Sequence, residues 1–320
     1  MYRRRARAAV LGVAAVVTVA CGGAPPAPPA AGPSSAPAAA AAPTSTPYAS
    51  AAPSQEQVDF ATHLEPFDPT AFSTPTKADN TWFPLTPGTR FVYEGSSQEP
   101  AAAPVPHRIV VTVTDLTKVI NGTRSILALD QEFSDGELSG AELAFYAQDD
   151  GGNIWHLGQY PETYENGELV EARPWIAGVD DARPGIMMKR EPDLGGPSYS
   201  QGWSPTLPWT DRARVSEVGV QRCVPAGCYD NIIVTQEFNR EEPGALQEKH
   251  YAPGVGNIRA ATAGRVETQE NLELVGVTQL DPSGLAEARA EALALEKRAY
   301  EQSADVYGTT APSEQTQPGN

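Results

Sequence analysis

Basic charge, histidine and cysteine are scarce in this sequence. Its residues include 23 Lys and Arg against 40 Asp and Glu, a net charge of −17 at pH 7, with four histidines and three cysteines. Such acidity disfavours contact with phosphate groups, so we expect no nucleic-acid partner. The histidines have no metal-ligand spacing, and H-E-x-x-H and G-x-S-x-G are both absent. We therefore expect no metal, no cofactor and no serine nucleophile.

A second long apolar run is also absent. The first, residues 8–20, follows Arg3, Arg4, Arg5 and Arg7 and ends just before Cys21. It is too short for a bilayer, which needs about 20 apolar residues, and it is typical of a cleaved signal peptide over residues 1–20.

The residues before Cys21 resemble a bacterial lipobox. They read Thr18-Val19-Ala20-Cys21-Gly22, with Thr18 where such boxes usually have Leu. Cleavage would make Cys21 the first mature residue and attach lipid to it, placing the protein on the extracytoplasmic face of the cell membrane. The alternative is an ordinary secretory peptide cut between residues 18 and 20.

The membrane contact depends on this lipid. Loss of residues 1–20 leaves 19 basic and 40 acidic residues, a net charge of −21. Residues 21–56 are nearly all Ala, Pro, Gly, Ser and Thr and predict a disordered tether. In an extended Pro-rich conformation this tether reaches on the order of 100 Å.

Residues 57–280 predict one all-β domain, an antiparallel meander that forms a barrel or half-barrel. Apolar residues alternate with period two, and Asn121-Gly122 is a strong hairpin signal between two such runs. Turn signals recur throughout, and no long helix interrupts them. We expect strands over residues 108–116, 123–133, 138–148, 153–160, 213–221, 228–238, 247–252, 256–261 and 265–279.

One helix is expected within residues 281–305, before a polar tail over 306–320 that we expect to be disordered. Asp281 and Pro282 form a helix start signal. A narrow stripe of small residues follows at helical spacing and predicts packing on the sheet. Its members are Leu285, Ala288, Ala292, Leu295 and Ala299.

Cys223 and Cys228 flank the turn sequence Val-Pro-Ala-Gly between two expected strands. Residues five apart across such a turn face each other, and in an exported protein they predict a disulfide. Cys21 is then the odd cysteine, committed to lipid.

An aromatic stretch over residues 175–209 is the strongest candidate for a site. It is long, poorly periodic and rich in Gly and Pro, and long loops in compact domains are often functional. It either lines an apolar cleft or plugs one end of the barrel as core. The expected ligand-binding residues are Trp155, Trp175, Met187, Met188, Trp203 and Trp209, with Tyr146 and His156 as polar groups.

The function that we expect is non-catalytic binding of an apolar ligand, an envelope component or a protein partner. One alternative is an envelope hydrolase that uses paired carboxylates chosen from Asp149, Asp150, Asp180 and Asp181. Another is a purely structural wall protein without a cleft. The sequence specifies no oligomeric state.

Several motifs resemble a group of exported bacterial proteins whose activity is not established. They are the F-P-L-x-P-G-x-x-x-V-Y-E-G segment at residues 83–95, residues 146–155, residues 175–188 and Y-A-P-G-V-G at 251–256. The basic run at residues 183–190 departs from the group. A fainter, fold-level likeness links the meander to half-barrel lipoproteins that carry lipids.

Overall fold

The structure of the protein, a computed structural model, describes residues 63–316 except 206, 208–210, 240–242, 265 and 267. The predicted signal peptide, Cys21 and the tether over residues 21–56 lie outside the described residues, so they stay predictions. The long helix in the described part of the chain is not apolar enough to cross a membrane, and no other helix there is long enough.

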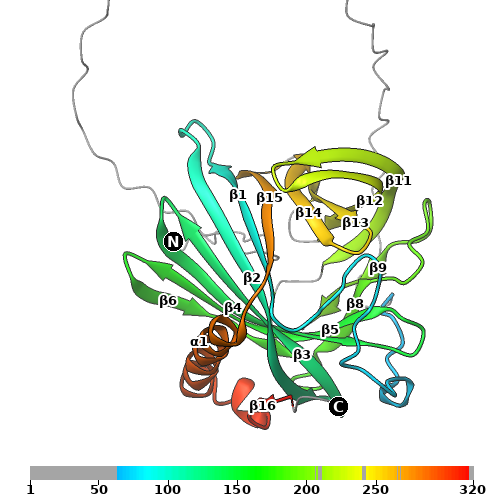
Figure 1. Cartoon of the computed structure of the whole chain (residues 1–320). Coiled ribbons are helices and arrows are strands. Elements are labelled where there is room, and N and C mark those ends of the chain that lie inside the picture. The colour runs from blue at the N-terminus through cyan, green and yellow to red at the C-terminus, as the bar shows by residue number, and fades with distance from the viewer. Residues whose placement is uncertain are drawn as a thin grey trace, which may run out of the picture. The chain divides into compact units, whose positions relative to one another are not determined.

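One antiparallel sheet dominates the described residues, which confirms the predicted all-β meander with a helix near the C-terminus (Figure 1). Its strands are β1 (Thr89–Gln98), β2 (Val105–Ile120), β3 (Thr123–Ser134), β4 (Glu137–Gln148), β5 (Ile154–Glu165), β6 (Glu168–Ala172), β7 (Trp175–Ile176), β8 (Arg183–Met188), β9 (Tyr199–Ser200), β10 (Gly202–Trp203), β11 (Arg212–Val224), β12 (Gly227–Phe238), β13 (Ala245–Ala252), β14 (Gly256–Gly264), β15 (Gln269–Gln279) and β16 (Glu314–Gln315). The helices are α1 (Pro282–Gln302) and the 3-10 turns η1 (Pro69–Ala71) and η2 (Tyr307–Thr309).

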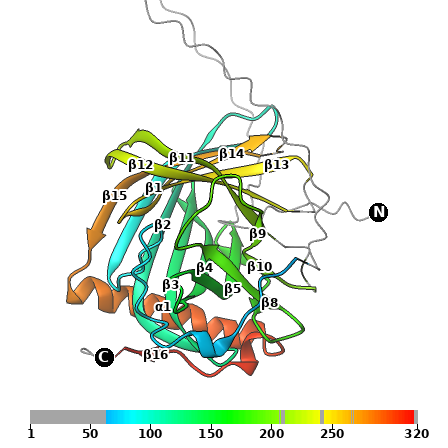
Figure 2. The same ribbon diagram turned by 90° about the vertical axis from the view of Figure 1, so that its right-hand side faces the viewer.

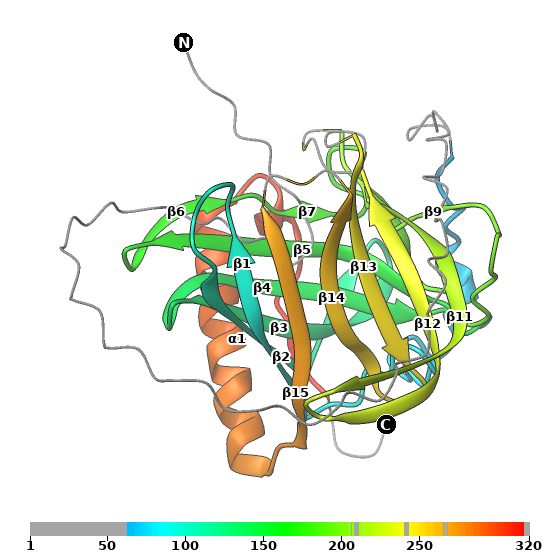
Figure 3. The same cartoon turned by 90° about the horizontal axis from the view of Figure 1, so that it is seen from above.

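Hairpins connect most neighbours in this sheet. Asn121 and Gly122 both have positive φ between β2 and β3, as a two-residue hairpin turn requires. The pairing most distant in sequence is that of β1, which pairs with β2 on one side and with β15 on the other (Figure 3). The first long strand therefore meets the last, and the sheet curls around an interior.

A single short segment joins the two edges of the sheet. Residues 199–200 pair with β11, and residues 202–203 pair with β8 (Figure 2). At Gly185 in β8, a Cβ atom would lie 2.3 Å from the carbonyl carbon of Gln201, so only glycine fits where the segment crosses. We call residues 199–203 the closing segment.

Each face of the curled sheet has its own hydrophobic core. The inner core fills the interior and includes Phe91, Ile109, Met188, Tyr251 and Leu274. The outer core covers the opposite face, where the small residues of α1 pack on β2 and β4 (Figure 1). Period-two alternation sends successive residues of one strand to the two cores.

The predicted helix begins and packs as expected. Asp281 caps α1, because its Oδ1 accepts a hydrogen bond of 2.8 Å from the Gly284 amide, and Pro282 follows at the first helical position. All of the predicted stripe except Leu285 is buried, and Glu296 is buried beside it.

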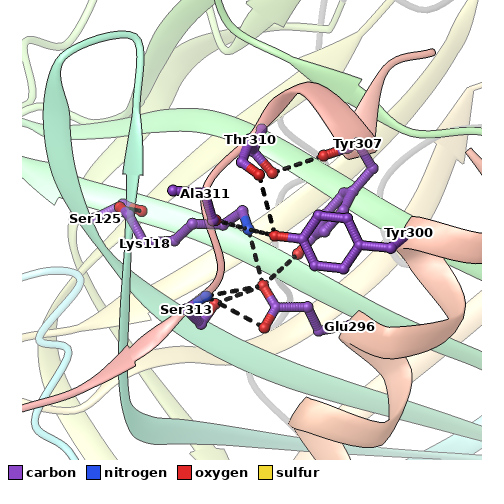
Figure 4. Close-up of polar contacts among 8 residues, drawn as sticks. All are labelled: Lys118, Ser125, Glu296, Tyr300, Tyr307, Thr310, Ala311 and Ser313. Atoms are coloured by element: carbon purple, nitrogen blue, oxygen red, sulfur yellow. Dashed lines mark hydrogen bonds and ion pairs between the residues drawn. The ribbon is translucent and has the colours of Figure 1, made fainter. Parts of the chain in front are cut away.

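Lys118 on β2 is the partner of Glu296 (Figure 4). The Lys118 Nζ lies 2.8 Å from Glu296 Oε1 and donates to Tyr300 Oη at 2.9 Å and to the Ala311 carbonyl at 2.6 Å. Glu296 also accepts from Tyr307 Oη at 3.2 Å. Both charges are fully buried, so this ion pair fixes α1 and the chain after it to the sheet.

The expectation of a disordered tail over residues 306–320 differs from the structure as far as residue 316. Tyr307 is completely buried, and Glu314 and Gln315 pair with Thr117 and Leu116 of β2. The reason is an open strand edge. β1 pairs with β2 only as far as Thr112, the Val113 carbonyl accepts from the Gly88 amide, and the edge of β2 beyond it is free to pair with residues 314–315.

Candidate functional site

A cavity of about 100 Å³ lies inside the curled sheet, within the inner core. Apolar and aromatic side chains form most of its wall, and a few polar groups complete it. Its lining residues are Phe83, Pro84, Leu85, Phe91, Tyr93, Val111, Val113, Ala128, Asp130, Glu142, Tyr146, His156, Gln159, Met187, Lys249, Tyr251, Val255, Gly256 and Asn257. A small apolar cavity with a few convergent polar groups is the usual form of a ligand site.

The segment over residues 80–85 covers one side of the cavity. Asn80 fixes its conformation, because Asn80 Oδ1 accepts hydrogen bonds from the amides of Trp82 at 2.8 Å and Phe83 at 3.1 Å. The Asn80 side chain also donates to the Gly152 carbonyl at 2.8 Å. Phe83 is thereby held edge-on to Tyr146, with ring centroids 5.4 Å apart.

Two carboxyl groups stand side by side in the cavity wall. Asp130 of β3 and Glu142 of β4 are directly opposite each other in the strand register. Side chains at such positions have Cβ atoms about 5 Å apart, and like charges there repel. Burial raises the pKa of Asp130 to about 7, against the attraction of Lys249. Burial and the neighbouring Asp130 raise the pKa of Glu142 to about 8.

Lys249 on β13 also lines the cavity, but another acid holds it. The Lys249 Nζ lies 2.7 Å from Glu237 Oε2, and both side chains are almost completely buried. Gln201 of the closing segment donates to Glu237 Oε1 at 3.0 Å. The closing segment is therefore tied to the interior as well as to the two sheet edges.

His156 contributes a neutral ring to the wall. It stacks on Tyr146 at a centroid distance of 5.1 Å. Burial lowers the pKa of His156 to about 3, so the imidazole carries no charge at neutral pH. Its expected role as a polar group of the site stays a prediction.

Three of the predicted site residues lie together in the cavity wall: Tyr146, His156 and Met187. Met188 is buried in the inner core beside them but is not part of the lining. These positions come from β4, β5 and β8, and the aromatic stretch thus supplies one of the cavity residues.

The predicted tryptophans lie elsewhere. Trp155 and Trp175 belong to the outer core, where Trp155 packs against Phe67 with ring centroids 5.3 Å apart. Trp203 is half-buried on the closing segment, and Trp209 lies outside the described residues. The two buried tryptophans are part of the outer core and do not line the cavity, although Trp175 packs edge-on against His156 at a centroid distance of 4.9 Å.

The four acids of the hydrolase alternative also lie away from the cavity lining. Asp149 accepts from Trp155 Nε1 at 2.8 Å, and Asp150 accepts from the Ser73 amide at 2.9 Å, so both stabilise a turn. Asp180 and Asp181 occupy a turn with positive φ. No group of three or more His, Cys, Asp or Glu residues in the described part of the chain could hold a metal ion.

The disulfide between Cys223 and Cys228 is present, as predicted, at the tip of the β11–β12 hairpin. Both cysteines are paired residues of that hairpin, and the turn between them packs back on the sheet. The Ala226 amide donates to the Leu274 carbonyl at 3.0 Å. The tip of the hairpin thus packs against the inner core, and the crosslink is not part of the cavity lining.

Sequence reasoning missed most of the cavity wall. Asp130 and Glu142 are hard to predict as site residues, because single carboxylates in a β-rich sequence usually face solvent. The sequence nonetheless contains a signal. Asp130 follows Ile126 and Ala128 at a spacing of two residues, which places all three side chains on the same face of the strand. A carboxyl group in phase with buried residues is unusual and marks a candidate site.

Comparisons with known proteins give the following. No family model matches the chain, and no curated protein matches it. Among solved structures, an exported protein of Bacteroides fragilis described as having a YmcC-like fold is 11% identical, with a TM-score of 0.38. A lipoprotein of Parabacteroides distasonis is 12% identical, with the same TM-score. Each alignment covers 62% of this chain and 99% of the other.

Proposed function

We propose that this protein is a lipid-anchored, extracytoplasmic binding protein that holds a small amphipathic ligand inside its β domain. The observation that carries the proposal is the interior cavity, whose wall is mainly aromatic and aliphatic and whose few polar groups include the paired carboxyl groups of Asp130 and Glu142. Protein interiors are otherwise close-packed, and buried carboxyl groups without strong partners are costly.

The sequence before the domain supplies the location. A basic start, a short apolar run and Cys21 favour export and lipid attachment. The acidic mature chain has little electrostatic attraction to anionic lipids, so the acyl chains would provide the membrane contact. The tether then places the binding domain away from the bilayer.

The cavity itself restricts the ligand. A cavity of about 150 Å³ holds benzene, so one of about 100 Å³ suits an apolar body of roughly four non-hydrogen atoms. Phe83, Leu85 and Val113 contribute apolar wall, and the polar groups of the lining can orient one polar end of the ligand.

The direct test is native mass spectrometry of the protein isolated from its own host. We expect a bound small molecule on the wild-type chain and its loss from Ala128→Val, which adds two carbon atoms to the cavity wall. Ala245→Val is the matched control, because Ala245 is a half-buried strand residue that does not line the cavity. Equal ligand content in all three proteins, or none in the wild type, would contradict the proposal.

A further inference from the structure

The polar part of the cavity wall carries an excess of acidic groups. Among the described residues that line it, Lys249 is the one cation, and it is ion-paired with Glu237. Within the described part of the chain, no cation forms an ion pair with Asp130 or Glu142, and Lys249 attracts both only from a longer distance. A cationic ligand would supply the missing charge, whereas an anionic ligand would add to the repulsion.

Asp130 gives an independent indication of a ligand. Only 9% of its surface is exposed, and its Oδ1 atom has no hydrogen-bond donor within the described part of the chain. Buried polar atoms are nearly always paired in folded proteins, so an unpaired oxygen in a cavity wall requires an explanation. A donor carried by the ligand provides one.

The rest of the wall suits the same chemistry. Phe83, Phe91, Tyr93, Tyr146 and Tyr251 all line the cavity. The faces of aromatic rings attract cations, and they equally pack against a short apolar body. Cations flanked by carboxylates and aromatic rings are a recurring mode of ammonium recognition.

We propose that the ligand of this cavity is a small organic cation, an ammonium group on a short apolar body, that Asp130 and Glu142 hold by charge-assisted hydrogen bonds. This inference rests on the proposed function and specifies its ligand class. Charge-assisted hydrogen bonds are roughly twice as strong as neutral ones, so the ammonium end would dominate affinity.

The neighbouring charges agree with this assignment. Glu132 also faces the interior, and burial holds its pKa well above the ordinary value. Glu237 neutralises Lys249, and His156 is uncharged. A bound ammonium group favours the ionised carboxylates, so binding releases protons near neutral pH and strengthens as the pH rises towards 8.

The test is calorimetric titration at pH 8 with three probes of similar size: n-butylamine, 1-butanol and sodium butyrate. The protein is the full-length chain with Cys21→Ser, which keeps it free of lipid. We expect n-butylamine to bind at least tenfold more tightly than 1-butanol, and butyrate to bind most weakly. The double variant Asp130→Asn/Glu142→Gln should lose this preference and still bind 1-butanol within about twofold of the parent.

The outcomes separate this inference from the function on which it rests. Equal affinity for the amine and the alcohol, or tighter binding of butyrate, would overturn the cation assignment and leave a neutral or anionic ligand. Failure of all three probes to bind would overturn the binding function too. Glu137→Gln is the matched control. It lies at an exposed position of β4, the strand that holds Glu142, and should keep the preference for the amine.

Discussion

Glu142 should make the protein less stable as the pH rises above neutrality, and Glu142→Gln should remove much of that loss. The folded protein holds the pKa of Glu142 near 8 against an ordinary value of 4.5. Between these two values the folded state keeps a proton that the unfolded state has lost. Stability therefore falls with increasing pH over this range. Above pH 8 Glu142 is ionised in both states, and its contribution to the free energy of unfolding no longer changes with pH.

The magnitude follows from the number of protons released. One proton corresponds to about 1.4 kcal/mol per pH unit, so the 1.5 units from pH 6.5 to 8 cost about 2 kcal/mol through Glu142. Asp130 adds a smaller loss of stability. Its pKa in the folded protein is about 7, so above that pH its carboxyl group is ionised in both states and its contribution no longer changes. Burial lowers the pKa values of His156 and His250. These two groups therefore reduce the stability of the folded protein only below pH 6.5 and do not affect the measurement.

The assay is urea denaturation of the Cys21→Ser chain at pH 6.5 and at pH 8, followed by circular dichroism. Glu132, whose pKa burial also holds well above its ordinary value, adds a further loss that Glu142→Gln leaves in place. The parent should therefore lose at least about 2–3 kcal/mol of unfolding free energy, and Glu142→Gln should lose about 2 kcal/mol less than the parent. Glu137→Gln changes the same atoms at an exposed position of β4 and should behave like the parent. A parent as stable at pH 8 as at pH 6.5 would refute the reasoning.

Four further predictions follow from particular contacts. Lys118→Met leaves Glu296 buried without its cation and should cost about 3–5 kcal/mol in urea denaturation; the double variant with Glu296→Leu should recover most of it, and no recovery would count against the ion pair. Cys223→Ser opens a short loop and should cost ~2 kcal/mol under oxidising conditions and nothing under reducing ones. Asn80→Ala leaves the amides of Trp82 and Phe83 without their acceptor and should cost about 2 kcal/mol in urea denaturation; an unchanged unfolding free energy would contradict this role of Asn80. Cys21→Ser should move the protein from the membrane fraction to the soluble fraction with an unchanged circular dichroism spectrum.

The sequence predicted the architecture because its signals are local. Alternating runs and the Asn121-Gly122 turn identify a meander without any knowledge of long-range contacts. The helix start at Asp281 is equally local. The expected strands omitted β1, since the Gly and Ser residues in its second half, Gly95-Ser96-Ser97, weaken the alternation there.

The cavity depends on contacts that no local signal reports. Asp130 is close to Glu142 by strand pairing, but it meets Lys249 only because the sheet curls. The expected position of Trp175 in the aromatic stretch over residues 175–209 has the same limit. Composition predicts that Trp175 is buried, but only the strand register shows which face of the sheet it lies on. The order of the tail over residues 306–316 was not predictable from composition, because a polar segment can still pair with an open strand edge.

The pairing of β1 with β15 sets an order of events in folding. Thr89 meets Gln279 across 190 residues of chain, and the closing segment can join the two edges only after β11 is in place. Contacts this distant in sequence make folding slow, on the scale of milliseconds to seconds. The domain therefore cannot complete its fold while the chain is still emerging from a ribosome or a translocation pore. A chain that stops before residue 269 lacks one partner of its first long strand.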